Sequence, residues 1–276
     1  MTTAPLIKLA SGHSVPQIGL GTWPLDDAAA ADVVATAVEL GYRHVDTAEN
    51  YGNEAGVGEG LRRSGVPRED LFITTKFNRE WHSAEGVHTA WENAVRKLGV
   101  DYLDLFLIHW PNPDQDTYVQ AWEGLIRLRA EGKVRSIGVS NFYPTHAARL
   151  IDATGVAPDV DQLQVSPYWV KPEARAFNAG HATVTEAYTP IGRGQDLLSE
   201  AVVVAAAEAH GVTPAQAVLR WHTQQGVVAI PKSSHPGRLA ENLDVFGFDL
   251  TAAEIAAFDG LDGKGPDAAD PEKFGH

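Results

Sequence analysis

Leu71-Phe-Ile-Thr-Thr-Lys76 and Leu105-Phe-Leu-Ile-His109 are short apolar stretches that each end in a polar side chain. A third apolar stretch ends at Asp46, and Tyr51 follows that acid by five residues. Stretches of this length and composition are typical of buried strands. In an α/β barrel the catalytic side chains gather at the carboxyl ends of the strands. These stretches therefore predict a barrel in which Asp46, Tyr51, Lys76 and His109 share one site.

The same alternation of short apolar stretches and helical patterns extends along the chain. From Ile18 onward we count eight expected strands, the last at residues 227–230, and no change in composition marks a domain boundary. We therefore expect a single (β/α)8 barrel domain over residues 1–276, with extra helices near its end. A glycine turn between residues 7–9 and 14–15 predicts an N-terminal β-hairpin that plugs one end of the barrel.

A doubly wound sheet would give the same alternation, but the glycines do not support it. Gly19-Leu-Gly21 lacks the third glycine of a dinucleotide fingerprint, and Gly56-Val-Gly58-Glu-Gly60 has the wrong spacing. The count of eight strands also favours the barrel.

Composition excludes several classes of function. A net charge of −14 argues against a nucleic-acid or anionic-membrane surface, and the absence of cysteine excludes disulfides and thiolate chemistry. The N-terminus has no targeting pattern, and the longest aliphatic run, residues 201–207, is too short to span a bilayer. We expect a cytoplasmic protein whose anionic ligands are bound by local clusters of Lys and Arg.

The four polar residues suggest a proton-transfer site. A tyrosine has a pKa near ~10, so it donates a proton readily only beside a cation, and Lys76 is the candidate. At ~4 Å and an effective dielectric constant of ~20, a lysine charge is worth about 4 kcal/mol, enough to bring the pKa of Tyr51 toward neutrality. Asp46 would keep Lys76 charged, and His109 would orient a substrate oxygen. Because the set includes no redox group, the reaction needs one from outside.

Several motifs of the chain resemble the signature blocks of the aldo-keto reductase superfamily, in family order. The blocks are Asp46-Thr-Ala with Tyr51-Gly-Asn-Glu54, Ile73-Thr-Thr-Lys76, Ile108-His-Trp-Pro111, Gly138-Val-Ser-Asn-Phe142 and Ile230-Pro-Lys-Ser233. Within the superfamily, the chain is most similar to the short prokaryotic members typified by 2,5-diketo-D-gluconate reductase.

The resemblance implies a nicotinamide cofactor at the barrel mouth and a catalytic tetrad of Asp46, Tyr51, Lys76 and His109, with Tyr51 as the general acid. It also implies cofactor contacts: Ser140, Asn141 and Gln162 with the carboxamide, Tyr188 stacked on the ring, Lys232, Ser233 and Arg238 with the adenosine phosphate, and Glu241 and Asn242 near the adenine. The sequence pattern independently supports the phosphate contact. Lys232 and Arg238 are six positions apart near a helix start, after the last strand, and make a local anion site. Such a pair favours NADPH over NADH.

Some positions depart from the family pattern or allow two interpretations. Gln164 and Ser166 stand where the family commonly has Glu and His, and Trp81 is displaced from the usual position of an aromatic residue. We interpret Trp23, Trp110 and Phe142 as walls of a substrate pocket, with core packing as the alternative.

We therefore expect an NADPH-dependent monomer that reduces aldehydes or ketones such as small carbonyls, α-dicarbonyls or keto-sugars. The short loops at residues 111–117 and 191–198 are typical of an open site. One alternative is a metal-dependent barrel hydrolase that uses His44, Asp46 and His109. Another is a non-catalytic subunit that senses a nucleotide.

Overall fold

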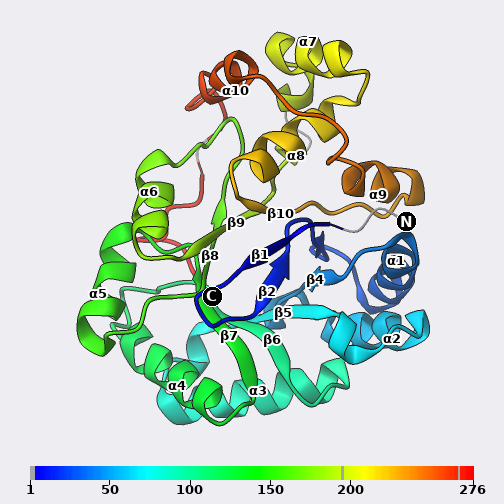
Figure 1. The fold of residues 1–276 in the computed structure, drawn as a ribbon. Coiled ribbons are helices and arrows are strands. Elements are labelled where there is room, and N and C mark those ends of the chain that lie inside the picture. Colours follow the sequence, from blue (N-terminus) through cyan, green and yellow to red (C-terminus); the bar gives the residue numbers. More distant parts are fainter. Residues whose placement is uncertain (1–3, 194–195, 267) are drawn as a thin grey trace.

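Eight parallel strands form the centre of the computed structural model, which describes residues 4–193, 196–266 and 268–276 (Figure 1). They are hydrogen-bonded in sequence order, and a parallel bridge between Ile18 and Ala229 joins the two ends of the sheet. The predicted barrel is therefore confirmed. The strands are β3 (Leu20–Gly21), β4 (His44–Asp46), β5 (Phe72–Phe77), β6 (Leu103–Ile108), β7 (Val134–Ser140), β8 (Val160–Gln164), β9 (Val184–Tyr188) and β10 (Val228–Ile230).

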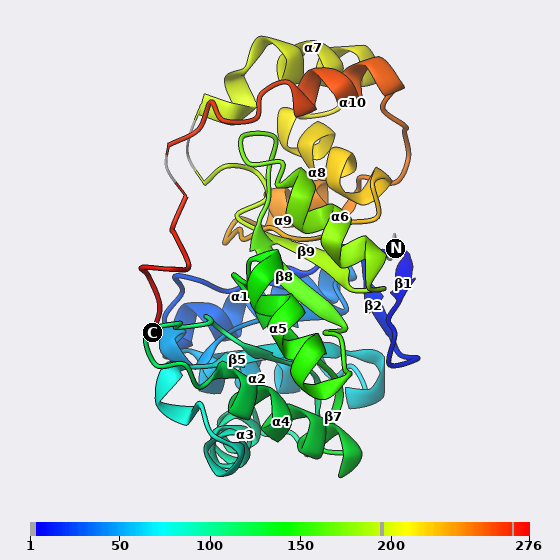
Figure 2. The ribbon, with the colours of Figure 1, turned by 90° about the vertical axis from the view of Figure 1, so that its left-hand side faces the viewer.

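Ten α-helices of the described residues surround the barrel or extend it (Figures 1 and 2). Helices α7 and α10 lie outside α8, at the end of the molecule farthest from α3 and α4. The helices are α1 (Asp27–Leu40), α2 (Glu54–Ser64), α3 (Ala84–Leu98), α4 (Tyr118–Ala130), α5 (Pro144–Thr154), α6 (Pro172–Gly180), α7 (Ala201–His210), α8 (Pro214–Gln224), α9 (Pro236–Leu243) and α10 (Ala252–Asp259).

The predicted hairpin covers the amino ends of the barrel strands. Strands β1 (Leu6–Lys8) and β2 (Ser14–Pro16) pair antiparallel, and Gly12 in the turn has a φ of 89°, which a glycine adopts without strain. Val15 belongs to an apolar cluster with Phe72 and Val228, the first residues of β5 and β10. The hairpin therefore closes the barrel at one end and leaves the carboxyl ends of the strands at the other.

The alternation of side chains along β5 explains how the strand delivers a lysine to the barrel mouth. Ile73 and Phe77 point outward and join the core formed with the helices. Phe72 points inward at the base, Thr74 bonds His44 inside the barrel, and Lys76 comes last on the same face. The period of two therefore places a polar group at the carboxyl end, with apolar packing behind it.

The helices of the described residues can be compared with the length and composition of a membrane span. No single helix there combines the length and the apolar composition that a bilayer crossing requires. Helices α7 and α8 meet both conditions only as a pair, bent by 89°.

Candidate active site

The structure brings together the four polar residues that the sequence singles out at the barrel mouth. Nζ of Lys76 lies 2.7 Å from Oδ1 of Asp46 and also donates to the carbonyl oxygen of Thr47 at 2.9 Å. The same Nζ is 5.3 Å from the centre of the Tyr51 ring, and that ring meets His109 edge to face at 5.9 Å. Tyr51 is the last residue of a short 3₁₀ helix, Glu49–Tyr51, that follows β4. Strands β4, β5 and β6 therefore converge on one polar cluster.

Burial and the neighbouring charges together determine the protonation states of Lys76 and His109. Burial is the largest single effect and opposes the charged form of Lys76, but Asp46, Tyr51 and Glu186 together outweigh it and raise the pKa of Lys76, so the amine stays protonated. Burial also lowers the pKa of His109 well below its usual value, and Lys76 adds to this effect, so the imidazole is neutral. The site therefore holds one stable ion pair beside a neutral histidine.

The expected effect of Lys76 on Tyr51 is only partly correct. The charge of Lys76 does lower the pKa of Tyr51, but burial of the phenol acts in the opposite direction and is the larger effect. The net pKa of Tyr51 is raised, so the expectation of a phenol that titrates near neutral pH is wrong for the protein alone. A phenol that keeps its proton is still suited to donate it.

Gln162 bridges two buried acids. Its Nε2 donates to Oδ2 of Asp46 at 2.7 Å and also to Oε1 of Glu186. Both amide hydrogens are thereby used, and no hydrogen bond to Oε1 of Gln162 occurs within the three described segments. A nicotinamide carboxamide carries an NH₂ group that needs such an acceptor, so Gln162 fits the role that the resemblance implies.

Sequence reasoning missed Glu186. The residue lies on β9, two positions before Tyr188, and its side chain is completely buried. Burial raises its pKa to about 8, and the nearby Asp46 adds to the rise. The signal was available, because a period of two counted back from Tyr188 places Glu186 on the face that lines the barrel.

Asn141 and Tyr188 form a second hydrogen-bonded unit next to Gln162. The Tyr188 hydroxyl donates to Oδ1 of Asn141 at 2.7 Å, and Nδ2 of Asn141 donates to the carbonyl oxygen of His109 at 3.2 Å. Asn141 has a φ of 63°, a conformation that asparagine tolerates better than most residues. The Ser140 hydroxyl donates to the carbonyl oxygen of Gln162 at 3.0 Å. All four residues expected at the nicotinamide thus lie together.

The residues expected at the adenosine phosphate lie after β10 and on α9. Lys232 and Arg238 are exposed, and neither forms an ion pair within the part of the chain that the structure describes. Ser233 is buried, and its hydroxyl accepts from the backbone N–H of His235, the residue that precedes α9. Two cations without acidic partners at a helix start can bind an anion. On the same helix, Glu241 is exposed and Asn242 is buried.

The three expected wall residues have different environments. Trp23 is 40% exposed, and the Arg193 guanidinium lies 3.8 Å above its ring. Trp110 is only 5% exposed. Phe142 has no exposed surface and packs edge to face against Tyr118, so the prediction that it lines the pocket is wrong. Core packing, the alternative interpretation, describes Phe142, because its ring packs against Tyr118 of α4 and His146 of α5.

The C-terminal end of the described chain lies on the opposite side of the barrel from the hairpin (Figure 2). The Phe274 ring meets Trp110 at 4.9 Å, and the His276 ring meets His109 at 5.3 Å. The N–H of Arg79 donates to the carbonyl oxygen of His276 at 2.9 Å, which holds the segment in place. Of the other mouth loop, residues 191–198, positions 194–195 lie outside the described residues.

The departures from the family pattern now have defined contacts. Nε1 of Trp81 donates to the Glu49 carboxylate at 3.0 Å, so the indole braces the 3₁₀ helix that carries Tyr51. Ser166 is buried in a turn, where its hydroxyl accepts from the N–H of Tyr168. Gln164 lines a small cavity beside Tyr188.

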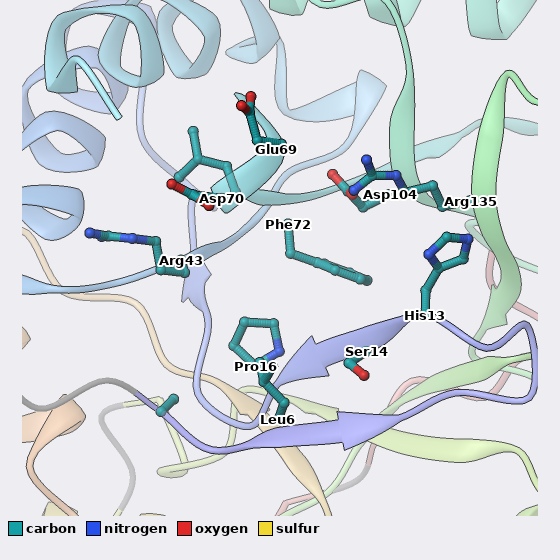
Figure 3. A pocket seen from close by; sticks show the side chains of 12 residues that line it. Leu6, His13, Ser14, Pro16, Arg43, Glu69, Asp70, Phe72, Asp104 and Arg135 are labelled. Atoms are coloured by element: carbon teal, nitrogen blue, oxygen red, sulfur yellow. The ribbon is translucent and has the colours of Figure 1, made fainter. Parts of the chain in front are cut away.

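A larger cavity, of about 450 Å³, lies at the other end of the barrel (Figure 3). Residues of the hairpin and of the strand starts line it, among them Ser14, Pro16 and Phe72. Its Arg135 is already paired with Asp104 at 2.9 Å. Because the amino ends of barrel strands serve stability rather than chemistry, we do not assign the functional site to this cavity.

Comparison with known proteins gives consistent matches. The model of the "Aldo/keto reductase family" matches residues 17–199 and 174–262. An aldo-keto reductase of Mycolicibacterium smegmatis is 46% identical over 272 residues, which are 96% of this chain and 97% of that protein. Methylglyoxal reductase DkgA of Yersinia pestis is 45% identical over 280 residues, covering 100% of this chain and 99% of that protein.

Solved structures agree in fold over nearly the whole chain. The crystal structure of Gox0644 in its apo form has a TM-score of 0.94 and 44% identity, and the match covers 99% of this chain and 100% of that one. A mutant of Gox0644 in complex with NADPH matches with the same TM-score, identity and coverage.

Proposed function

The chain belongs to the aldo/keto reductase family, and we propose that it is an NADPH-dependent oxidoreductase that reduces aldehydes or ketones to alcohols, with Tyr51 as the general acid. The observation that carries this proposal is the buried ion pair of Lys76 and Asp46 beneath the Tyr51 ring. The NADPH complex of Gox0644 supports the choice of cofactor.

Bound NADPH supplies the hydride that the polypeptide lacks. The protein contributes the proton and the orientation. Tyr51 donates its proton to the carbonyl oxygen, and the charge of Lys76 stabilises the phenolate that remains. His109 is neutral, so it offers an N–H to the same oxygen and orients the carbonyl without competing for the proton.

The contacts of the cluster also explain how the tetrad keeps its shape. Oδ1 of Asp46 binds Lys76 and Oδ2 binds Gln162, so the carboxylate is fixed from two sides. Lys76 is fixed in turn by Asp46 and by the carbonyl oxygen of Thr47. A catalytic lysine that is held in this way needs little rearrangement as charge develops on the phenol.

Gln162, Asn141 and Ser140 would hold the carboxamide, and Tyr188 would stack on the ring. Lys232, Ser233 and Arg238 would bind the 2′-phosphate, which makes NADPH the preferred cofactor over NADH. Glu241 and Asn242 would lie near the adenine. The exposure of both cations, without acidic partners in the described segments, supports the phosphate assignment.

Two observations support a substrate class: the name of one relative and the aromatic side chains at the barrel mouth. Methylglyoxal reductase DkgA of Yersinia pestis is named for a small α-dicarbonyl. Trp110 stacks beside His109, and Trp23 is 40% exposed. These two side chains would supply apolar walls suited to small aldehydes, α-dicarbonyls and keto-sugars. The test is a steady-state scan in which the purified chain oxidises NADPH in the presence of methylglyoxal and simple aldehydes. Absence of turnover with every carbonyl, despite tight binding of NADPH, would favour a nucleotide-sensing subunit instead.

A metal-dependent hydrolase has little support. Both oxygens of Asp46 are bound to Lys76 and Gln162, and Nε2 of His44 is hydrogen-bonded to Thr74. Among the described residues, no group of three or more His, Asp or Glu side chains could hold a metal ion. Location in the cytoplasm and a monomeric state stay predictions, and size-exclusion chromatography with light scattering tests the second.

A further inference from the structure

Glu186 is a completely buried acid with an incomplete set of partners. Oε1 accepts from Gln162, whereas Oε2 makes no hydrogen bond with any described residue and lies 3.8 Å from Nε2 of His44. The residue does not belong to the tetrad, yet a single nitrogen atom, Nε2 of Gln162, links it to Asp46. Its chemistry is therefore coupled to the tetrad through one amide.

The groups that face Glu186 set its charge. His44 and Asp46 face it from β4, Lys76 from β5 and Gln162 from β8. His44 is neutral, because burial lowers its pKa to about 3. The positive charge of Lys76 and the negative charge of Asp46 cancel. The cluster therefore has one net negative charge when Glu186 is ionised and is neutral when Glu186 is protonated. Burial and Asp46 raise the pKa of Glu186 to about 8, which puts this change near physiological pH.

The amide of Gln162 depends on the same contact. Two carboxyl groups accept its two N–H bonds, so its Oε1 is turned away from both of them. In the proposed function this oxygen accepts from the carboxamide of the cofactor. Without Glu186, one N–H loses its partner and the amide is held only by its hydrogen bond to Asp46.

We propose that Glu186 is a positioning residue for the proposed reduction: it fixes the amide of Gln162 and supplies a switchable negative charge that favours the oxidised over the reduced cofactor. The inference rests on the proposed function. Its physical basis is that the oxidised nicotinamide ring is cationic and the reduced ring is neutral, so a nearby negative charge stabilises only the oxidised form. As pH rises and Glu186 ionises, NADP⁺ binds more tightly relative to NADPH.

The test measures equilibrium binding of NADPH and NADP⁺ by fluorescence titration between pH 6.5 and pH 9, a range that spans about one and a half pH units below and one above the titration. In the wild-type chain we expect the preference for NADP⁺ over NADPH to rise about tenfold across this range. Glu186→Gln abolishes this rise, because the amide cannot ionise, and Glu186→Asp retains part of it. Glu39→Gln, which removes an exposed charge on α1, behaves as wild type.

A rise that survives in Glu186→Gln overturns the inference and leaves the proposed function intact. If the wild-type chain binds neither cofactor, the proposed function fails and the inference fails with it. A second measurement needs no variant: carbon NMR of the wild-type chain with labelled glutamate should show one carboxyl that titrates near pH 8 and whose pKa falls when NADP⁺ binds. Absence of that carboxyl overturns the inference even if the Glu186 variants do not fold.

Discussion

The ammonium of Lys76 and the carboxylate of Asp46 are 2.7 Å apart, and both side chains are almost completely buried. Two charges inside a barrel are stable only as a pair, because each alone would have lost its water without compensation. The pair therefore supports the fold as well as the proposed chemistry, and the two contributions can be measured separately.

Lys76→Met leaves Asp46 buried without its cation, so we expect the free energy of unfolding to fall by about 3 to 5 kcal/mol. The double change Lys76→Met with Asp46→Asn removes the orphaned charge and should be less destabilised than Lys76→Met alone. Urea unfolding followed by circular dichroism gives both values. A double variant as unstable as the sum of the two single ones would mean that the pair is not coupled.

Tyr51→Phe removes the proposed proton donor and leaves the ring in place. We expect kcat to fall by ~10² to 10⁴, the usual worth of a general acid, while the affinity for NADPH stays nearly unchanged. Tyr102→Phe is the matched control, because its hydroxyl has no hydrogen-bond partner among the described residues and the residue lies beside the starts of β6 and β7. Retained turnover in Tyr51→Phe would exclude the phenol as the acid.

Lys232→Ala tests the phosphate assignment. Loss of one charge from a phosphate site should weaken NADPH by about tenfold or more and leave NADH almost unaffected, because only NADPH carries the 2′-phosphate. Lys8→Ala removes an exposed lysine from the hairpin at the opposite end of the barrel and controls for the change in net charge. Equal losses for both cofactors would place the 2′-phosphate elsewhere.

We expect the free energy of unfolding of Asp161→Asn to exceed that of the wild type by a margin that grows as pH rises. Burial raises the pKa of Asp161 to about 8, from an ordinary value of 3.8. Between those two values the folded state keeps a proton that the unfolded state has lost, so the stability of the wild type falls as pH increases through this window. Asparagine removes the titration, and the advantage of the variant should grow by about 1 kcal/mol per pH unit up to pH 8.

Unfolding series at several pH values between 5 and 8 supply the measurement. Asn178 already donates to Oδ2 of Asp161, and an asparagine at position 161 can still accept that bond through its own oxygen. A difference between variant and wild type that stays constant with pH would show that Asp161 is ionised in the folded protein.

The sequence was sufficient for the barrel and for the grouping of the tetrad. Lys76 and His109 end apolar strands, and parallel strands deliver their last residues to one rim, so local pattern and topology agree. The pKa of Tyr51 was beyond reach, because the balance between burial and the charge of Lys76 depends on the depth of the phenol. Phe142 was misplaced because its burial depends on contacts with Tyr118 and His146, which lie on two different helices.

Contacts between distant segments were also hidden from the sequence. His276 contacts His109, which lies 167 positions earlier in the chain. No local sequence pattern near residue 276 predicts this contact. Glu186 is an intermediate case. The sequence could predict that its side chain faces the barrel interior, but its hydrogen bond with Gln162 depends on the register between β8 and β9.

Residue 276 is held against the rim where we place catalysis, whereas the hairpin at residues 6–16 lies on the far side of the barrel (Figure 2). An affinity tag or fusion partner joined after His276 would emerge beside His109 and crowd the entrance. The same addition before Leu6 would leave that entrance clear. Polypeptide joined to residue 276 would therefore affect access to the site more than polypeptide joined ahead of the hairpin, and the activities of the two kinds of fusion measure that difference.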